Sequence, residues 1–153
     1  MCRTLHKYFL FFIGCLITTN TYALTSNQLC QAFKTQNLKI QKNLPIEIDY
    51  LTTLIGIQVL DMGTYCHLNY NHVINTEKFI KTLATTDDIP TATIINFLKS
   101  KEGIKTLQDE MLTTGQERFS EFLKYKNIKI TLHYAYDTNQ LPSVHVTPID
   151  TTK

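Results

Sequence analysis

The stretch IKITLHYAYDTNQLPSVHVTPI, residues 128–149, decides the fold class. Its first half alternates apolar and polar side chains over ten residues, which is typical of a half-buried β-strand. Thr138-Asn139-Gln140 predicts a turn, and Val144 and Val146 share the parity of the apolar side chains before it. The stretch therefore predicts an antiparallel hairpin in which even-numbered residues pair with even-numbered residues.

A second hairpin is expected upstream, on either side of Asp61-Met62-Gly63. A turn made by Met62 and Gly63 would pair Asp61 with Thr64. The same register would pair Val59 with Cys66, Ile57 with Leu68 and Ile55 with Tyr70. This register puts the apolar side chains on one face, whereas a slip of one residue would scatter them over both.

Apolar residues recur at helical intervals in the segments before and between the two hairpins. Ser26 is expected to cap a first helix that Leu44-Pro45 ends. Residues 76–125 are expected to form two or three helices, with Asp87-Asp88 as N-terminal caps before Pro90, a break at Gly103 and a C-cap at Gly115. This order predicts an α+β fold, a two-layer sandwich whose antiparallel sheet of two hairpins carries helices on one face.

The first 23 residues have the three parts of an export signal. Arg3 and Lys7 precede the apolar run Tyr8–Ile17, and a polar segment ends at Ala23. The run is about half the roughly 20 apolar residues that a transmembrane helix needs. We expect a signal peptide over 1–23 and a single α+β domain over 24–153, in a periplasmic or secreted protein with no membrane insertion after cleavage. A lipoprotein anchored at Cys15 is the alternative, and an uncleaved anchor is a third.

Cys30 and Cys66 remain after removal of such a signal. An even count in an oxidising compartment favours one disulfide. The first helix places Cys30 beside Leu29 and Phe33, and the register above turns Cys66 toward the same core. We expect a Cys30–Cys66 disulfide, with two buried free thiols as the alternative.

Composition excludes several classes of protein. The chain has 153 residues, 43% apolar and 18% charged, which excludes a disordered tail, a coiled coil and a multipass membrane protein. Arg3 and Lys7 account for the net charge of +2, so the remainder is neutral and predicts no nucleic-acid partner. We find no P-loop, dinucleotide, nucleophile-elbow, HExxH or EF-hand spacing, and expect no enzyme and no cofactor.

The polar face of the predicted sheet is the expected partner-binding surface. Its residues are His67, Asn69, Thr131, His133, His145 and Thr147. Three imidazoles that converged there would suit zinc or copper, but the order of the hairpins is open and we predict no metal. Tyr65 lies on this face as an additional anchor. His72 has the parity of the core, as have Tyr70, Tyr134 and Tyr136, and is expected at a strand end or buried with its polar atoms satisfied.

Two segments carry a resemblance to a known group. Leu44–Leu54 reads L-P-x3-D-x2-T-x-L, and the last hairpin contains ITLHYAYD. They resemble a group of small exported bacterial proteins of unknown function, in which the first motif opens one hairpin and a Y-x-Y-x-D hairpin closes the domain. This chain departs from that group in its cysteines, because its middle helix has none where the group carries one. The resemblance covers residues 44–149 and implies export and fold, with no activity.

These observations indicate a non-enzymatic accessory or binding protein with a protein partner, supporting a secretion system or another envelope assembly. The alternative is an inhibitor of a lytic or proteolytic enzyme, which needs a protruding anchor, and Leu141-Pro142 is the candidate. A small hydrolase is a third reading, disfavoured because no nucleophile has a recognisable base.

Overall fold

The computed structural model describes residues 24–153, so the predicted signal peptide lies outside the described residues. Helix α2 (Ser26–Gln41) precedes strands β1 (Ile46–Glu47), β2 (Thr52–Asp61) and β3 (Cys66–Ile74). Helices α3 (Thr76–Asp87), α4 (Thr91–Lys99) and α5 (Lys101–Arg118) and the 3-10 helix η1 (Ser120–Lys124) follow. Strands β4 (Ile128–Tyr136) and β5 (Val144–Asp150) end the chain. The described chain is thus an α+β fold, as predicted.

The strands form one five-stranded sheet in the order β1-β2-β3-β4-β5. Each predicted hairpin is antiparallel, but β3 and β4 pair in parallel, from Cys66 with Ile128 to Ile74 with Tyr136. The prediction of an antiparallel sheet made of two hairpins is therefore wrong. A parallel pair needs a long crossover, and the helical segment α3–α5 supplies it. Alternation within a strand carries no information about the direction of its neighbour.

The register of β2 and β3 differs from the predicted one by two residues. Asp61 pairs with Cys66 and Val59 pairs with Leu68. The loop is longer than a two-residue turn, because the Met62 N–H donates to the Tyr65 carbonyl at 3.0 Å and Asp61 Oδ1 accepts from the Gly63 N–H at 2.9 Å. A shift of two residues leaves Ile57 and Val59 on their predicted face.

A β-bulge in β2 overturns the prediction for Ile55. The register shifts between Leu54 and Gly56, so Ile55 is the extra residue. Leu54 is buried instead, and 49% of Ile55 is exposed. In the last hairpin Tyr134 pairs with Val144 and Leu132 with Val146, as predicted, but the register shifts between Ile130 and Leu132, so that Ile130 pairs with the odd-numbered Ile149.

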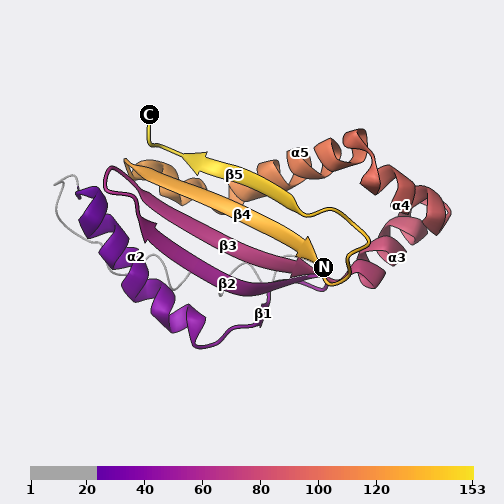
Figure 1. The fold of residues 1–153 in the computed structure, drawn as a ribbon, viewed down its shortest axis with the longest axis horizontal. Helices are drawn as coiled ribbons and strands as arrows, with labels where there is room; N and C mark the ends of the chain where they lie inside the picture. The colour runs from indigo at the N-terminus through magenta and orange to yellow at the C-terminus, as the bar shows by residue number, and fades with distance from the viewer. Residues whose placement is uncertain (1–23) are drawn as a thin grey trace.

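Side chains of β3 and β4 alternate strictly between buried and partly buried. The buried side, called the core face below, is contributed mainly by β3, β4 and β5 and includes Cys66, Leu68, Tyr70, His72, Ile74, Ile128, Ile130, Leu132, Tyr134, Tyr136, Val144 and Val146. Helix α2 contacts β2 and β3, and α5 contacts β5. In Figure 1, α2 runs beside β2, α5 passes behind β5, and α3 and α4 lie beyond the end of the sheet.

Helix α2 is tied to the β2–β3 hairpin at its N-terminal end. The Cys30–Cys66 disulfide is formed, which confirms that prediction. Ser26 Oγ donates to the Gly63 carbonyl at 2.7 Å, and Asn27 Nδ2 donates to Asp61 at 3.0 Å. The N-cap is Thr25, one residue before the predicted Ser26, with its hydroxyl accepting from the Gln28 N–H.

The helix boundaries between residues 76 and 125 correct three sequence expectations. Asp87 and Asp88 end α3 rather than capping α4. Gly103 lies in the first turn of α5, which Ser100 caps. Gly115 lies inside α5, where an added Cβ would be 3.0 Å from Leu132 and Pro148, so its lack of a side chain lets the helix approach the sheet.

Candidate functional site

The predicted binding residues lie together on the side of the sheet opposite the core face. Asn69 pairs with Thr131 across β3 and β4, and His133 pairs with His145 across β4 and β5. Parallel pairing of β3 with β4 also brings in His67, whose place the sequence left open. Its Nε2 lies 2.9 Å from Thr131 Oγ1. We call this surface the polar face, formed by Gln58, His67, Asn69, Asn71, Lys129, Thr131, His133, His145 and Thr147.

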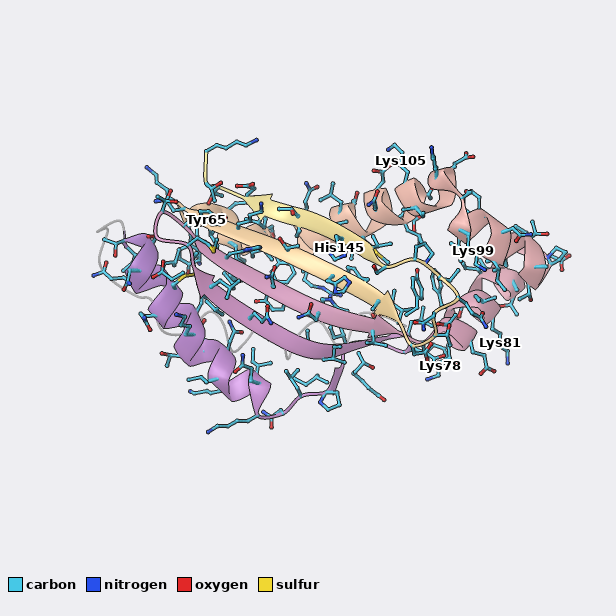
Figure 2. The ribbon with its side chains drawn as sticks, viewed as in Figure 1. Tyr65, Lys78, Lys81, Lys99, Lys105 and His145 are labelled. Carbon is cyan, nitrogen blue, oxygen red and sulfur yellow. A yellow bond between two sulfur atoms is a disulfide. The ribbon has the colours of Figure 1, made fainter. Side chains whose placement is uncertain are left out.

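The polar face is open along its length. His145, Thr147 and Gln58 are exposed, and the side chains from β3 and β4 between them are partly buried by their neighbours. Figure 2 views the sheet from a side on which no described helix crosses β3 or β4, with Tyr65 and His145 labelled over it. A wide, regular surface of hydrogen-bonding groups is therefore available to another molecule.

A pair of stacked imidazoles occupies one side of the polar face. The ring centroids of His133 and His145 are 4.1 Å apart, and the ring planes differ by 9°. Partial burial lowers the pKa of His133, and the neighbouring His145 lowers it further. Both effects favour the uncharged form of the His133 ring.

The charges on this face balance one another. Lys129 pairs in register with Asp150 at the β4–β5 edge. Partial burial lowers the pKa of His67, the charge of Lys129 adds to this effect, and Asp150 opposes it. Lys129 and Asp150 therefore offset each other's charge at this edge of the face.

Apolar side chains border the face at the β2–β3 loop. Leu60 pairs in register with His67, and 42% of it is exposed. The Tyr65 ring lies 6.3 Å from the His67 ring, where the sequence placed an additional anchor. Sequence reasoning missed Leu60, Gln58 and Asn71 on this surface. The parity of β2 and β3 already held the signal for all three residues, because each lies opposite in parity to the predicted core residues of its strand.

His72 lies on the core face, as its parity predicted, and its ring stacks on Tyr134 with centroids 4.6 Å apart. Its Nδ1 is buried without a hydrogen-bond partner, so the expectation of a satisfied buried histidine is wrong. Burial lowers the pKa of His72 to about 4, and the nearby Arg118 charge acts in the same direction. His72 is a neutral core residue at pH 7.

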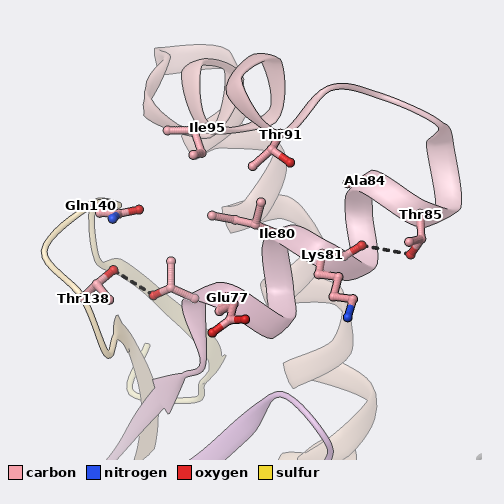
Figure 3. A pocket seen from close by; sticks show the side chains of 10 residues that line it. Glu77, Ile80, Lys81, Ala84, Thr85, Thr91, Ile95, Thr138 and Gln140 are labelled. Carbon is pink, nitrogen blue, oxygen red and sulfur yellow. Dashed lines mark hydrogen bonds between the residues drawn. The ribbon is translucent and has the colours of Figure 1, made fainter.

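A cavity of about 540 Å³ lies between α3, α4 and the β4–β5 connection (Figure 3). Its lining mixes Ile80, Ala84 and Ile95 with threonines and the pair Glu77 and Lys81. Thr138 Oγ1 donates to Thr76 Oγ1 at 3.0 Å, and Asp137 accepts from both the N–H and the hydroxyl of Thr76. These hydrogen bonds lower the pKa of Asp137 and fix the start of α3 to the end of β4. The polar groups beside this cavity therefore serve the fold.

Three further features were tested as candidate sites: the loop of a possible inhibitor, a metal cluster and a membrane-spanning helix. Leu141, the candidate anchor of an inhibitory loop, is buried with 7% of its surface exposed. Residues 24–153 contain no group of three or more His, Cys, Asp or Glu side chains placed to hold a metal ion. None of the helices within this range has the length and apolar character required to traverse a bilayer.

Comparison of the chain with protein-family models, with curated proteins and with solved structures finds no match.

Proposed function

We propose that the chain is an exported, non-enzymatic accessory or binding protein that docks a protein partner on the polar face of its sheet. The observation that carries the proposal is the collection of neutral hydrogen-bonding side chains on three adjacent strands, from His67 to Thr147. Protein interfaces outside the obligate class are about as polar as ordinary surface, so docking here needs no charged or strongly apolar patch.

The architecture behind this proposal is a two-layer one. Cys30 of α2 is bonded to Cys66 of the core face, and Gly115 of α5 lies against Leu132 of the same face. Helices that cover only this side leave the polar face free for a partner. A secretion system or another envelope assembly is the kind of machinery that such a domain would support.

The disulfide supports export, because such bonds persist in oxidising compartments. The resemblance to small exported bacterial proteins implies the same location. We expect the mature protein to begin at Leu24 and to be released from the periplasm by osmotic shock. Intact-mass spectrometry tests this, since a mass beginning at an acylated Cys15 would establish a lipoprotein instead.

Site-specific photocrosslinking in living cells tests the docking surface. A crosslinking amino acid at Thr131, in the middle of the polar face, should give a discrete adduct with a protein partner. Thr113 is exposed on α5 and serves as the matched control, which should give no adduct of that mass. The proposal fails if the two positions give the same adducts, or if only Thr113 gives one.

The inhibitor alternative would have to use another surface, because Leu141 packs into the core. Addition of the purified protein to lytic enzymes and proteases of the envelope tests it directly. A stoichiometric loss of their activity, unaffected by Thr147→Arg on the polar face, would favour the alternative over the docking proposal.

A further inference from the structure

We infer that the loop between β2 and β3, residues 62–65, is the apolar anchor of the interface, and that Met62 enters an apolar pocket of the protein partner. The side chains of Leu60, Met62 and Tyr65 are called the loop anchor below. Half of Met62 and 42% of Leu60 are exposed, and Tyr65 is partly exposed. This inference rests on the proposed docking function and extends its surface to one end of the sheet.

The loop anchor is continuous with the polar face. Leu60 pairs in register with His67, and the Tyr65 ring lies 6.3 Å from the His67 ring, so both side chains adjoin the same imidazole. Met62 follows Leu60 by two residues at the start of the loop. In Figure 2, Tyr65 is labelled near one end of the sheet and His145 farther along it. A partner that lies on the polar face at His67 therefore reaches the loop as well.

Helix α2 fixes the loop from one side. Ser26 Oγ donates to the Gly63 carbonyl at 2.7 Å, and Asn27 Nδ2 donates to Asp61 Oδ2 at 3.0 Å. The disulfide bond joins the same helix to the first residue of β3. Three links to α2 therefore hold the backbone on both sides of Met62.

Hydrogen bonds within the loop define its conformation further. Asp61 Oδ1 accepts from the Gly63 N–H at 2.9 Å, and the Met62 N–H donates to the Tyr65 carbonyl at 3.0 Å. Gly63 has a φ of 81°, in the left-handed region that favours glycine. Each carboxylate oxygen of Asp61 thus accepts a hydrogen bond from the chain itself, so this charge serves the loop and does not oppose an apolar contact beside it.

A fixed loop with adjoining exposed apolar side chains has the properties of an interface anchor. Apolar residues scattered singly over a surface are ordinary, but the loop anchor gathers three of them beside one imidazole. Because the loop is already ordered, little conformational entropy is lost when a partner covers it. The binding energy of protein interfaces is concentrated in a few such residues, surrounded by contacts that exclude water.

The side chains define the chemistry of the partner's pocket. Methionine is unbranched and flexible, so Met62 adapts to an apolar pocket of irregular shape. Tyr65 offers an apolar ring and a hydroxyl that can remain at the rim. The neighbouring His67 and Thr131 already lie 2.9 Å apart and add hydrogen-bonding groups to that rim. The loop therefore fits a folded protein with an apolar pocket bordered by hydrogen-bonding groups.

Photocrosslinking in living cells from Met62 tests the inference. A crosslinking amino acid at Met62 should capture the same protein as one at Thr131, with the adducts identified by peptide mass spectrometry. Leu38 is the matched control, because 56% of it is exposed and it lies about 12 Å along α2 from Cys30; it should not capture that protein. An adduct from Thr131 with none from Met62 would overturn the inference and leave the docking proposal standing. Absence of adducts from both positions would overturn both.

Calorimetric titration of the captured protein, once purified, measures the contribution of the loop. Met62→Asp should raise the Kd at least about tenfold, because it places a charge in an apolar pocket. Met62→Ala adds no charge and should raise the Kd at least about fivefold. Leu38→Asp should leave the Kd within about twofold of the parental value, and all three variants should keep the parental melting temperature, since these positions are exposed. A parental Kd for either folded Met62 variant would contradict the inference.

Discussion

The two faces of strand β4 differ in burial and in the type of side chain that each holds, although the residues of the two faces alternate along the strand. Leu132 is fully buried on the core face, while its neighbours Thr131 and His133 lie on the polar face. The same contrast holds for two histidines, since His72 is buried with an unpartnered Nδ1 and His133 stacks on His145 near solvent. Side-chain direction, rather than residue type or place in the chain, thus decides which residues hold the fold and which are free for binding.

Leu132→Ala tests the difference between the two faces with the largest expected effect. Removing a fully buried leucine should lower the free energy of unfolding by about 3 to 5 kcal/mol, because lost burial and the cavity both destabilise. Thr131→Ala is the adjacent control and should change it by less than about 0.5 kcal/mol. Urea unfolding of both variants checks the difference. Equal effects would show that the two faces are not distinct.

Loss of the disulfide should have the next largest effect. Cys30 and Cys66 are separated by 36 residues, and closing a loop of this length stabilises by roughly 3 to 4 kcal/mol in the chain-entropy model. Cys66→Ala should lower the melting temperature by many degrees. Thermal unfolding measures this, and thiol titration of the denatured, unreduced parent should find neither of these cysteines free.

The burial of His72 predicts that the stability of the protein depends on pH. The pKa of His72 is lowered to about 4 in the folded protein, whereas in the unfolded chain it is near 6.5. Between these values the unfolded state binds more protons, so stability rises with pH and its His72 contribution is complete above about pH 6.5. As the pH falls from about 6.5 to about 4, this contribution of His72 is lost, which lowers the free energy of unfolding by up to about 3 kcal/mol.

His72→Phe sharpens this prediction. Phenylalanine keeps the stacking on Tyr134 and removes the buried, unpartnered Nδ1, so stability should be equal or higher at pH 7. Its unfolding free energy should fall less than that of the parent between pH 6.5 and 4. Urea unfolding at several pH values tests this, and an unchanged pH slope would mean that other groups cause the loss.

The alternation of apolar and polar residues predicted which face of each strand is buried, but it did not predict the direction in which neighbouring strands pair. The parity of residues 128–149 placed Tyr134, Val144 and Val146 in the core, because packing against helices demands apolar groups at every second position. The parallel pairing of β3 and β4 depends on how the distant crossover packs, and this leaves no mark in either strand. The bulge at Ile55 breaks the periodicity on which the prediction relied.

The sequence predicted which residues form the candidate site, but only part of how they contact one another. The six polar positions follow from parity alone. Contact between His67 and Thr131 required the order of the strands, which the sequence left open. Stacking of His133 on His145 was within reach of the predicted register, but parity says nothing about side-chain rotamers.

The double substitution His133→Ala and His145→Ala tests the central claim most directly, with partner crosslinking from Thr131 and unfolding measured on the same protein. Outward strand positions change stability by under about 0.5 kcal/mol, so we predict near-parental unfolding together with a large loss of the adduct. An adduct of parental yield from the folded double variant would contradict binding at these histidines. Unfolding of the variant would contradict the assignment of the faces and move the search for a binding surface to the helices.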